Sequence, residues 1–139
     1  MVNYITDRKS KKEVLKGFEP LIRKWFNSKF DDLTPPQSMA VPLIHNKENV
    51  LVSSPTGSGK TLTAFLSIIN DFLKIHRENE FEDGVHAIYI SPLKALANDI
   101  DRNLKQPLDE MMKIAEELDI DVPEIKVAVR SGDTSLKER

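Results

Sequence analysis

The segment SPTGSGKT at residues 54–61 constrains the fold of this chain more than any other stretch of its sequence. An apolar run at residues 50–53 precedes it and predicts a short buried strand, while apolar residues recur at helical spacing from 62 to 73. A strand, a glycine-bearing loop and a helix, in that order, form the setting that a phosphate-binding loop requires. The sequence therefore predicts a nucleoside-triphosphate site at this junction.

Each part of the predicted loop suits a separate task in phosphate binding. Gly57 and Gly59 let the backbone turn tightly and approach an anion, so the amides of residues 57–61 are expected to point at phosphate oxygens. Lys60 can reach the β- and γ-phosphates, and the Thr61 hydroxyl suits a Mg²⁺ ligand, which makes these two residues the predicted catalytic pair. The first position of the pattern, usually glycine, is Ser54 here. The full predicted phosphate-binding set is Thr56, Gly57, Ser58, Gly59, Lys60 and Thr61.

The composition is that of an ordinary globular domain without a membrane segment. Of the 139 residues, 40% are apolar and 30% are charged, and no apolar run is long enough to span a bilayer. The N-terminus is polar and shows no signal peptide, and the absence of cysteine excludes a disulfide framework and a thiolate metal site. A cytoplasmic location is the default expectation. The net charge of −2 gives no global attraction to nucleic acid, so contacts with it are expected to be local.

Helices and strands are predicted to alternate along the rest of the chain. An apolar stripe at residues 11–30 predicts a helix, and the TPPQ sequence at 34–37 opens another, with Thr34 as N-cap and Gln37 completing a capping box. Further strands are predicted at 85–91 and 125–129, around a helical stretch that is interrupted at Pro107. This alternation predicts an α/β fold with a parallel sheet. The histidines show no metal-ligand spacing and are interpreted as structural or exposed: His45, His76 and His86.

Four features in a fixed order resemble the first RecA-like domain of superfamily 2 helicases, and within the DEAD/DEAH-like group the Lhr (large helicase-related) type. They are TPPQ at 34–37, the loop at 54–61, SPLKALAND at 91–99 and RSGDT at 130–134. The resemblance covers most of the chain, from about residue 18 onward. It implies a P-loop NTPase fold with three α/β/α layers, here incomplete. It also implies a helical segment at 1–46 and a partial RecA-like ATP-binding domain at 47–139.

The resemblance also implies roles for residues outside the phosphate loop. Gln37 is implied to read the adenine of ATP, because a carboxamide can bond both the amino group and N7 of that base. Phe18 and Trp25 are candidates for stacking on the adenine. Two further segments are implied to contact the backbone of single-stranded nucleic acid, DNA or RNA: Ser91, Pro92, Leu93 and Lys94, then Gly132, Asp133 and Thr134.

Some parts of the helicase pattern are missing from this sequence. It contains no Asp-Glu-x-His motif, and its single Asp-Glu pair, Asp109-Glu110, falls in a predicted helix rather than at a strand end. We therefore interpret the chain as an N-terminal piece of an ATP-dependent helicase, truncated before the metal-binding (Walker B) strand, that binds nucleotide without efficient hydrolysis. Unpaired strand edges predict self-association. The alternatives are a small P-loop kinase and a stand-alone nucleotide- or nucleic-acid-binding module.

Overall fold

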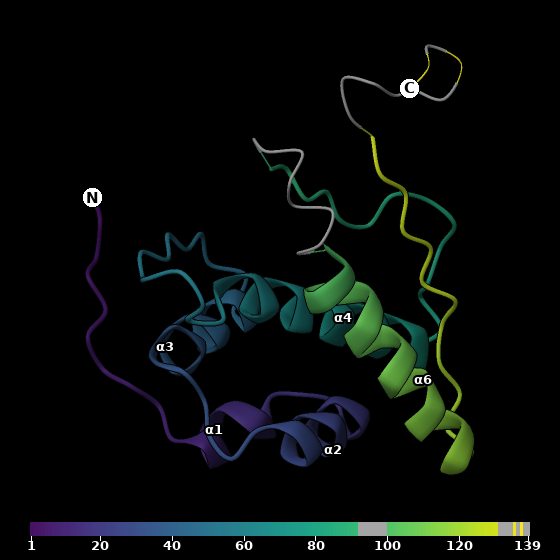
Figure 1. Ribbon diagram of the computed structural model, residues 1–139, viewed down its shortest axis with the longest axis horizontal. Coiled ribbons are helices and arrows are strands. Elements are labelled where there is room, and N and C mark those ends of the chain that lie inside the picture. Colours follow the sequence, from purple (N-terminus) through teal and green to yellow (C-terminus); the bar gives the residue numbers. More distant parts are fainter. Residues whose placement is uncertain (92–99, 131–134, 136, 138–139) are drawn as a thin grey trace.

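The computed structural model of the chain describes residues 1–91, 100–130, 135 and 137. Its helices pack on one another, with α1 and α2 below α3 and α4, and with α6 across one side of the molecule (Figure 1). Within the described ranges, every helix is too short or too polar to span a lipid bilayer. The helical elements are α1 Lys11–Lys16, α2 Pro20–Lys29, α3 Pro35–His45, α4 Lys60–Arg77, the π-helix η2 Asp101–Lys105 and α6 Gln106–Glu117.

The apolar stripe at residues 11–30 forms two helices, so the prediction of one helical segment was wrong at its centre. Gly17 is the C-cap of α1, and Pro20 is the first residue of α2. Glu19 has an extended backbone with φ −60° and ψ 149°. A proline disfavours helical backbone at the residue before it, whereas its own fixed φ suits the first helical position. The break therefore follows from the Glu19-Pro20 pair.

Helix α3 begins as its sequence predicts. Pro35 is its first residue, and the Oε1 atom of Gln37 accepts a hydrogen bond of 2.9 Å from the backbone N–H of the N-cap Thr34. This bond is the glutamine half of a capping box, which satisfies a backbone donor that the helix itself leaves unpaired. The structural role predicted for Gln37 is thus confirmed.

The interruption predicted at Pro107 takes the form of a π-helix. Residues Asp101–Lys105 are wound as η2, and α6 begins at Gln106 with Pro107 in its first turn. A proline has no N–H to donate and its ring clashes with the carbonyl four residues earlier in an α-helix. The π turn comes directly before this proline, so the hydrogen-bonding pattern changes where a proline cannot continue it.

The hydrophobic core lies between α1, α2, α3, α4, η2 and α6. Ile22 and Phe26 of α2 are fully buried, and Leu66 and Ile69 of α4 are 1% exposed. Polar contacts join the same helices: Asn70 Oδ1 in α4 accepts a hydrogen bond of 2.7 Å from the backbone N–H of the α2 N-cap, Glu19. The buried apolar cluster comprises Val14, Leu15, Phe18, Leu21, Ile22, Trp25, Phe26, Val41, Leu62, Phe65, Leu66, Ile69, Leu104, Met111 and Ala115.

The predicted parallel sheet is not formed by the described residues. The segments 50–53, 85–91 and 125–129 were predicted as strands, but all three lack regular secondary structure. Several of their apolar side chains face solvent, with Leu51 93%, Ile90 87% and Val129 54% exposed, whereas Ile125 is half-buried against the core. The hydrogen bonds of a strand all go to a neighbouring strand, so an apolar run without a partner stays irregular. The three-layer arrangement and the division at residue 46 therefore remain predictions.

Candidate functional site

The loop at residues 54–59 turns through two glycines in left-handed conformation. Gly57 has φ 81° and Gly59 has φ 83°, values that side-chain-bearing residues rarely adopt. Gly59 is also the N-cap of α4, so the loop leads directly into that helix. The backbone thus forms a tight turn at the positive end of a long helix, which favours a bound anion.

Lys60 is the central donor of the loop. Its Nζ donates to the carbonyl oxygens of Ser54 at 2.5 Å and Pro55 at 2.9 Å. The backbone N–H of Ser58 donates to the same Pro55 carbonyl at 3.3 Å. The loop therefore surrounds the Lys60 ammonium group, which lies inside the turn. Phosphate oxygens are charged, so they accept hydrogen bonds from an ammonium group more strongly than peptide carbonyls do.

The threonines near the loop differ in their surroundings. Thr63 is buried and its Oγ1 donates to the Gly59 carbonyl at 2.7 Å, so its hydroxyl is used within α4. Thr61, in the first turn of α4, is half-buried, and Thr56 in the loop is exposed. A hard cation such as Mg²⁺ takes a hydroxyl oxygen as ligand. Thr61 fits the predicted Mg²⁺ ligand better than Thr63, because the Thr63 hydroxyl is already bonded within α4. In the part of the chain that the structure describes, no group of three or more His, Cys, Asp and Glu residues could hold a metal.

The structure brings Gln37 against the phosphate loop. Gln37 is 4% exposed, and a Cβ atom at Gly59 would lie 2.9 Å from its Nε2 atom and 3.3 Å from Thr34 Oγ1. Gly59 is therefore required both for its backbone conformation and for this close approach, and the sequence alone did not reveal the second reason. The adenine-reading role of Gln37 stays a prediction.

The two aromatic residues considered for adenine stacking lie in the core. Phe18 is 3% exposed and meets the His45 ring edge-on, with 4.8 Å between ring centroids. Trp25 is also 3% exposed, and its Nε1 donates to Glu110 Oε2 at 2.7 Å. Neither ring has an open face for a base, so both suggestions were wrong.

The predicted nucleic-acid contacts fall mostly outside the described residues. Ser91 is described: it is half-buried, and its buried Oγ has no hydrogen-bond partner among the described residues. The residues that lie outside the described ranges are Pro92, Leu93, Lys94, Gly132, Asp133 and Thr134.

Glu110 has a structural explanation that agrees with rejecting the Asp109-Glu110 pair as a metal site. Its carboxylate accepts hydrogen bonds from Lys29 Nζ and Trp25 Nε1, each at 2.7 Å. The hydrogen bond from Lys29 is the main cause that lowers the pKa of Glu110 from its ordinary value. The carboxylate is thus committed to joining α6 to α2.

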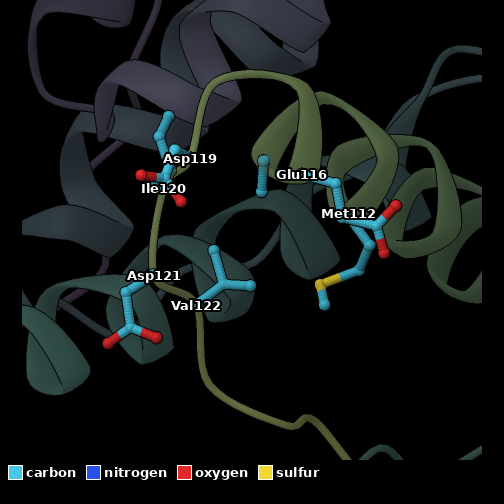
Figure 2. Close-up of a pocket in the computed structure, with 7 residues that line it drawn as sticks. Met112, Glu116, Asp119, Ile120, Asp121 and Val122 are labelled. Carbon is cyan, nitrogen blue, oxygen red and sulfur yellow. The ribbon is translucent and has the colours of Figure 1, made fainter.

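A pocket of about 320 Å³ lies away from the phosphate loop, at the C-terminal end of α6. Figure 2 shows its lining side chains, which include both apolar groups and several carboxylates. Carboxylates repel anions, so this pocket does not suit nucleotide phosphates. Its lining residues are Met112, Ala115, Glu116, Asp119, Ile120, Asp121 and Val122.

Comparisons with known proteins agree with one another. The family model described as DEAD/DEAH box helicase matches residues 34–133. The chain is 46% identical to the ATP-dependent helicase Lhr-Core of Methanocaldococcus jannaschii, over 99% of this chain and 16% of that protein. It is 48% identical to the ATP-dependent helicase Lhr-Core protein 2 of Thermococcus barophilus, over 100% of this chain and 16% of that protein.

A solved structure gives a further likeness. The Mycobacterium smegmatis helicase Lhr, solved bound to ssDNA and AMP-PNP, superposes with a TM-score of 0.77 and 43% sequence identity. The match covers 89% of this chain and 15% of that one. The chain therefore spans about a sixth of the length of the proteins that it matches.

Proposed function

Because this chain belongs to the DEAD/DEAH box helicase family, we propose that it supplies the ATP-binding part of an ATP-dependent helicase of the Lhr type. The observation that carries the proposal is the loop at 54–59, whose left-handed glycines place the Lys60 ammonium inside a turn at the start of α4. The AMP-PNP bound to the M. smegmatis Lhr helicase, an ATP analogue by its name, supports the same assignment.

The residues of the loop divide the work of holding the nucleotide. Lys60 exchanges its two carbonyl acceptors for phosphate oxygens, and the amides of residues 57–61 complete the cradle. This cradle requires glycine at position 59, since a side chain there would collide with Gln37. Mg²⁺, when bound, neutralises phosphate charge, and the half-buried Thr61 is the residue of this loop that would hold it. The fit of a glycine-lined cradle with one lysine and one hydroxyl supports both groups.

The family implies a RecA-like P-loop fold for the chain. We propose that the segments 50–53, 85–91 and 125–129 are parallel strands of its sheet, which pair fully only with further strands of a complete domain. The support is their apolar composition together with the exposure of Leu51 and Ile90. Exposed unpaired strands also bind one another, so we propose that the isolated chain self-associates through them.

The proposed nucleic-acid partner is a single strand. The M. smegmatis Lhr helicase was solved with ssDNA, and this supports contacts from residues 91–94 and 132–134 to a sugar-phosphate backbone. The chemistry of phosphate contacts does not distinguish DNA from RNA, so the proposal includes both.

We propose that this chain binds nucleotide but does not hydrolyse it efficiently. The Asp-Glu-x-His sequence that holds Mg²⁺ in the family is absent from these 139 residues. The sequence has a single Asp-Glu pair, Asp109-Glu110. The carboxylate of Glu110 accepts hydrogen bonds from Trp25 and Lys29 and is therefore not free to replace that motif. ATP turnover that is robust, stimulated by nucleic acid and abolished in Lys60→Ala would contradict this part of the proposal.

Nucleotide binding is tested with the purified chain and a fluorescent ATP analogue. Lys60→Ala removes a charge-assisted contact, so the affinity is expected to fall by about 10- to 100-fold. Lys126→Ala is the matched control, because this lysine is 82% exposed and removes the same charge far from the loop in sequence. Equal loss in both variants would show that only net charge matters.

The adenine role of Gln37 is tested by competition between ATP and GTP. The unsubstituted chain is expected to prefer ATP, and Gln37→Ala is expected to lose that preference. Because Gln37 also caps α3, a thermal unfolding curve must accompany each measurement. Equal affinity for the two nucleotides in the unsubstituted chain would exclude the role.

Self-association is tested by sedimentation over a range of concentrations. We expect the average mass to rise with concentration, and Ile88→Lys to reduce the rise, because a charge on an exposed strand opposes pairing. A strictly monomeric profile at high concentration would contradict the proposal.

A further inference from the structure

Two of the donors predicted to bind phosphate, the Lys60 ammonium and the Ser58 amide, are already paired within the loop. Lys60 Nζ donates to the carbonyls of Ser54 and Pro55, and the Ser58 N–H donates to the Pro55 carbonyl. An incoming phosphate must therefore displace these carbonyls before it gains the same donors. Any contact that holds the carbonyls in place lowers the apparent affinity for nucleotide, because only the fraction of chains with an open loop can bind.

A pair of side chains closes the loop in addition to these backbone contacts. Ser54 Oγ and Ser58 Oγ are 2.6 Å apart, which is a short hydroxyl–hydroxyl hydrogen bond between two half-buried residues. Ser54 stands at the first position of the loop, where the general phosphate-loop pattern has a glycine. A glycine has no side chain and cannot form this bond. The serine that departs from the pattern thus has a contact of its own.

We propose that the Ser54–Ser58 hydroxyl pair is a latch that holds the loop wrapped around Lys60 and thereby limits how fast and how tightly nucleotide binds. The inference rests on the proposed nucleotide site and concerns its regulation. Ser54 supplies both the latch hydroxyl and one of the two carbonyls bound to Lys60. Ser58 likewise supplies both a latch hydroxyl and the amide N–H that donates to the Pro55 carbonyl, so two of the contacts that close the loop belong to one residue.

The latch is tested with Ser54→Ala, Ser58→Ala and the double variant in the full chain. Each single substitution is expected to raise the association rate and the affinity for a fluorescent ADP by about two- to tenfold, the effect of one neutral hydrogen bond. The double variant is expected to match the singles, because both remove the same bond. Ser53→Ala is the control, since this exposed neighbour lies outside the pair and is expected to change nothing.

Several results would overturn the latch. Weaker nucleotide binding in the single variants would show that the hydroxyls contact the ligand. Unchanged binding would show that the pair has no influence, and additive effects in the double variant would show that the two hydroxyls act separately.

A measurement without nucleotide separates the latch from the proposed function. Hydrogen exchange of the Ser58 amide is expected to be faster in Ser54→Ala than in the unsubstituted chain, because the loop opens more often. If the chain binds no nucleotide, the proposed function fails, yet this exchange rate still decides the latch. Equal exchange in the two chains would overturn it.

Discussion

The helical layer and the three irregular segments of this chain contain similar apolar residues in opposite surroundings. Ile22 of α2 is fully buried, whereas Ile90 in the segment 85–91 is 87% exposed. An α-helix pairs its backbone groups within itself and then needs only one apolar face covered. A strand needs a neighbour for its backbone as well as cover for its side chains. In the described residues the helices are therefore formed, whereas the segments predicted as strands have no pairing partner.

The largest expected effect compares the two isoleucines directly. Ile22→Ala leaves a cavity in the core and is expected to lower the free energy of unfolding by about 2–5 kcal/mol. Ile90→Ala removes the same atoms from an exposed site and is expected to change it by less than about 0.5 kcal/mol. Chemical denaturation followed by circular dichroism measures both. A large loss in Ile90→Ala would show that the segment is buried in solution and would remove the contrast between the two regions.

The parts of the fold that the sequence predicted correctly are those fixed by neighbours in the chain. The Gln37 cap lies three residues from Thr34, and helix α4 follows from apolar spacing after the glycine loop. The break near Pro107 is likewise local, because a proline acts on the turn that precedes it. The break at Glu19-Pro20 is also marked by a proline, but the apolar stripe continues through it, so the periodicity did not reveal the boundary between the two helices.

The parts that could not be predicted depend on contacts distant in the sequence or on side-chain geometry. Trp25 bonds to Glu110, 85 residues away, and no pattern in the sequence links the two. The approach of Gln37 to Gly59 depends on how α3 packs against α4. The hydroxyl pair of Ser54 and Ser58 depends on how the loop closes. The sheet predicted from the segments 50–53, 85–91 and 125–129 is not formed by the described residues, because a strand needs a partner that the periodicity of one segment does not identify.

A second prediction concerns the bond that joins α6 to the rest of the helical layer. Glu110→Ala leaves the indole N–H of the buried Trp25 without its acceptor and removes the contact with Lys29, so the free energy of unfolding is expected to fall by about 1–3 kcal/mol. Glu117→Ala is the matched control on the same helix, because Glu117 is exposed. Equal effects of the two substitutions would show that α6 is held by apolar packing alone.

Acid should weaken the same junction. The pKa of Glu110 is lowered, first by the Lys29 hydrogen bond, so its stabilising effect is fully present above the ordinary carboxyl value of about 4.5. The effect is lost as the pH falls through the lowered pKa, because folded chains then take up the proton as well. The pH dependence of stability in this acid range is expected to be flatter in Glu110→Ala than in the unsubstituted chain.

The smallest expected effect tests how tightly α3 packs on the join between α1 and α2. His45 lies against Phe18 and Gly17, and its buried Nε2 has no hydrogen-bond partner in the part of the chain that the structure describes. Burial is the main cause that lowers its pKa, which Asp71 opposes and Lys47 and Lys74 reinforce. The unfolded chain takes up a proton below about pH 6.5 while the folded chain resists it, so stability is expected to fall as the pH drops through that value. His45→Gln cannot titrate and should show a flatter dependence between pH 7 and 5, measured by denaturation at each pH. Identical slopes of stability against pH in the two chains would mean that the imidazole of His45 is solvated. The helical layer would then be open to water where α3 meets α1 and α2, as the three irregular segments are.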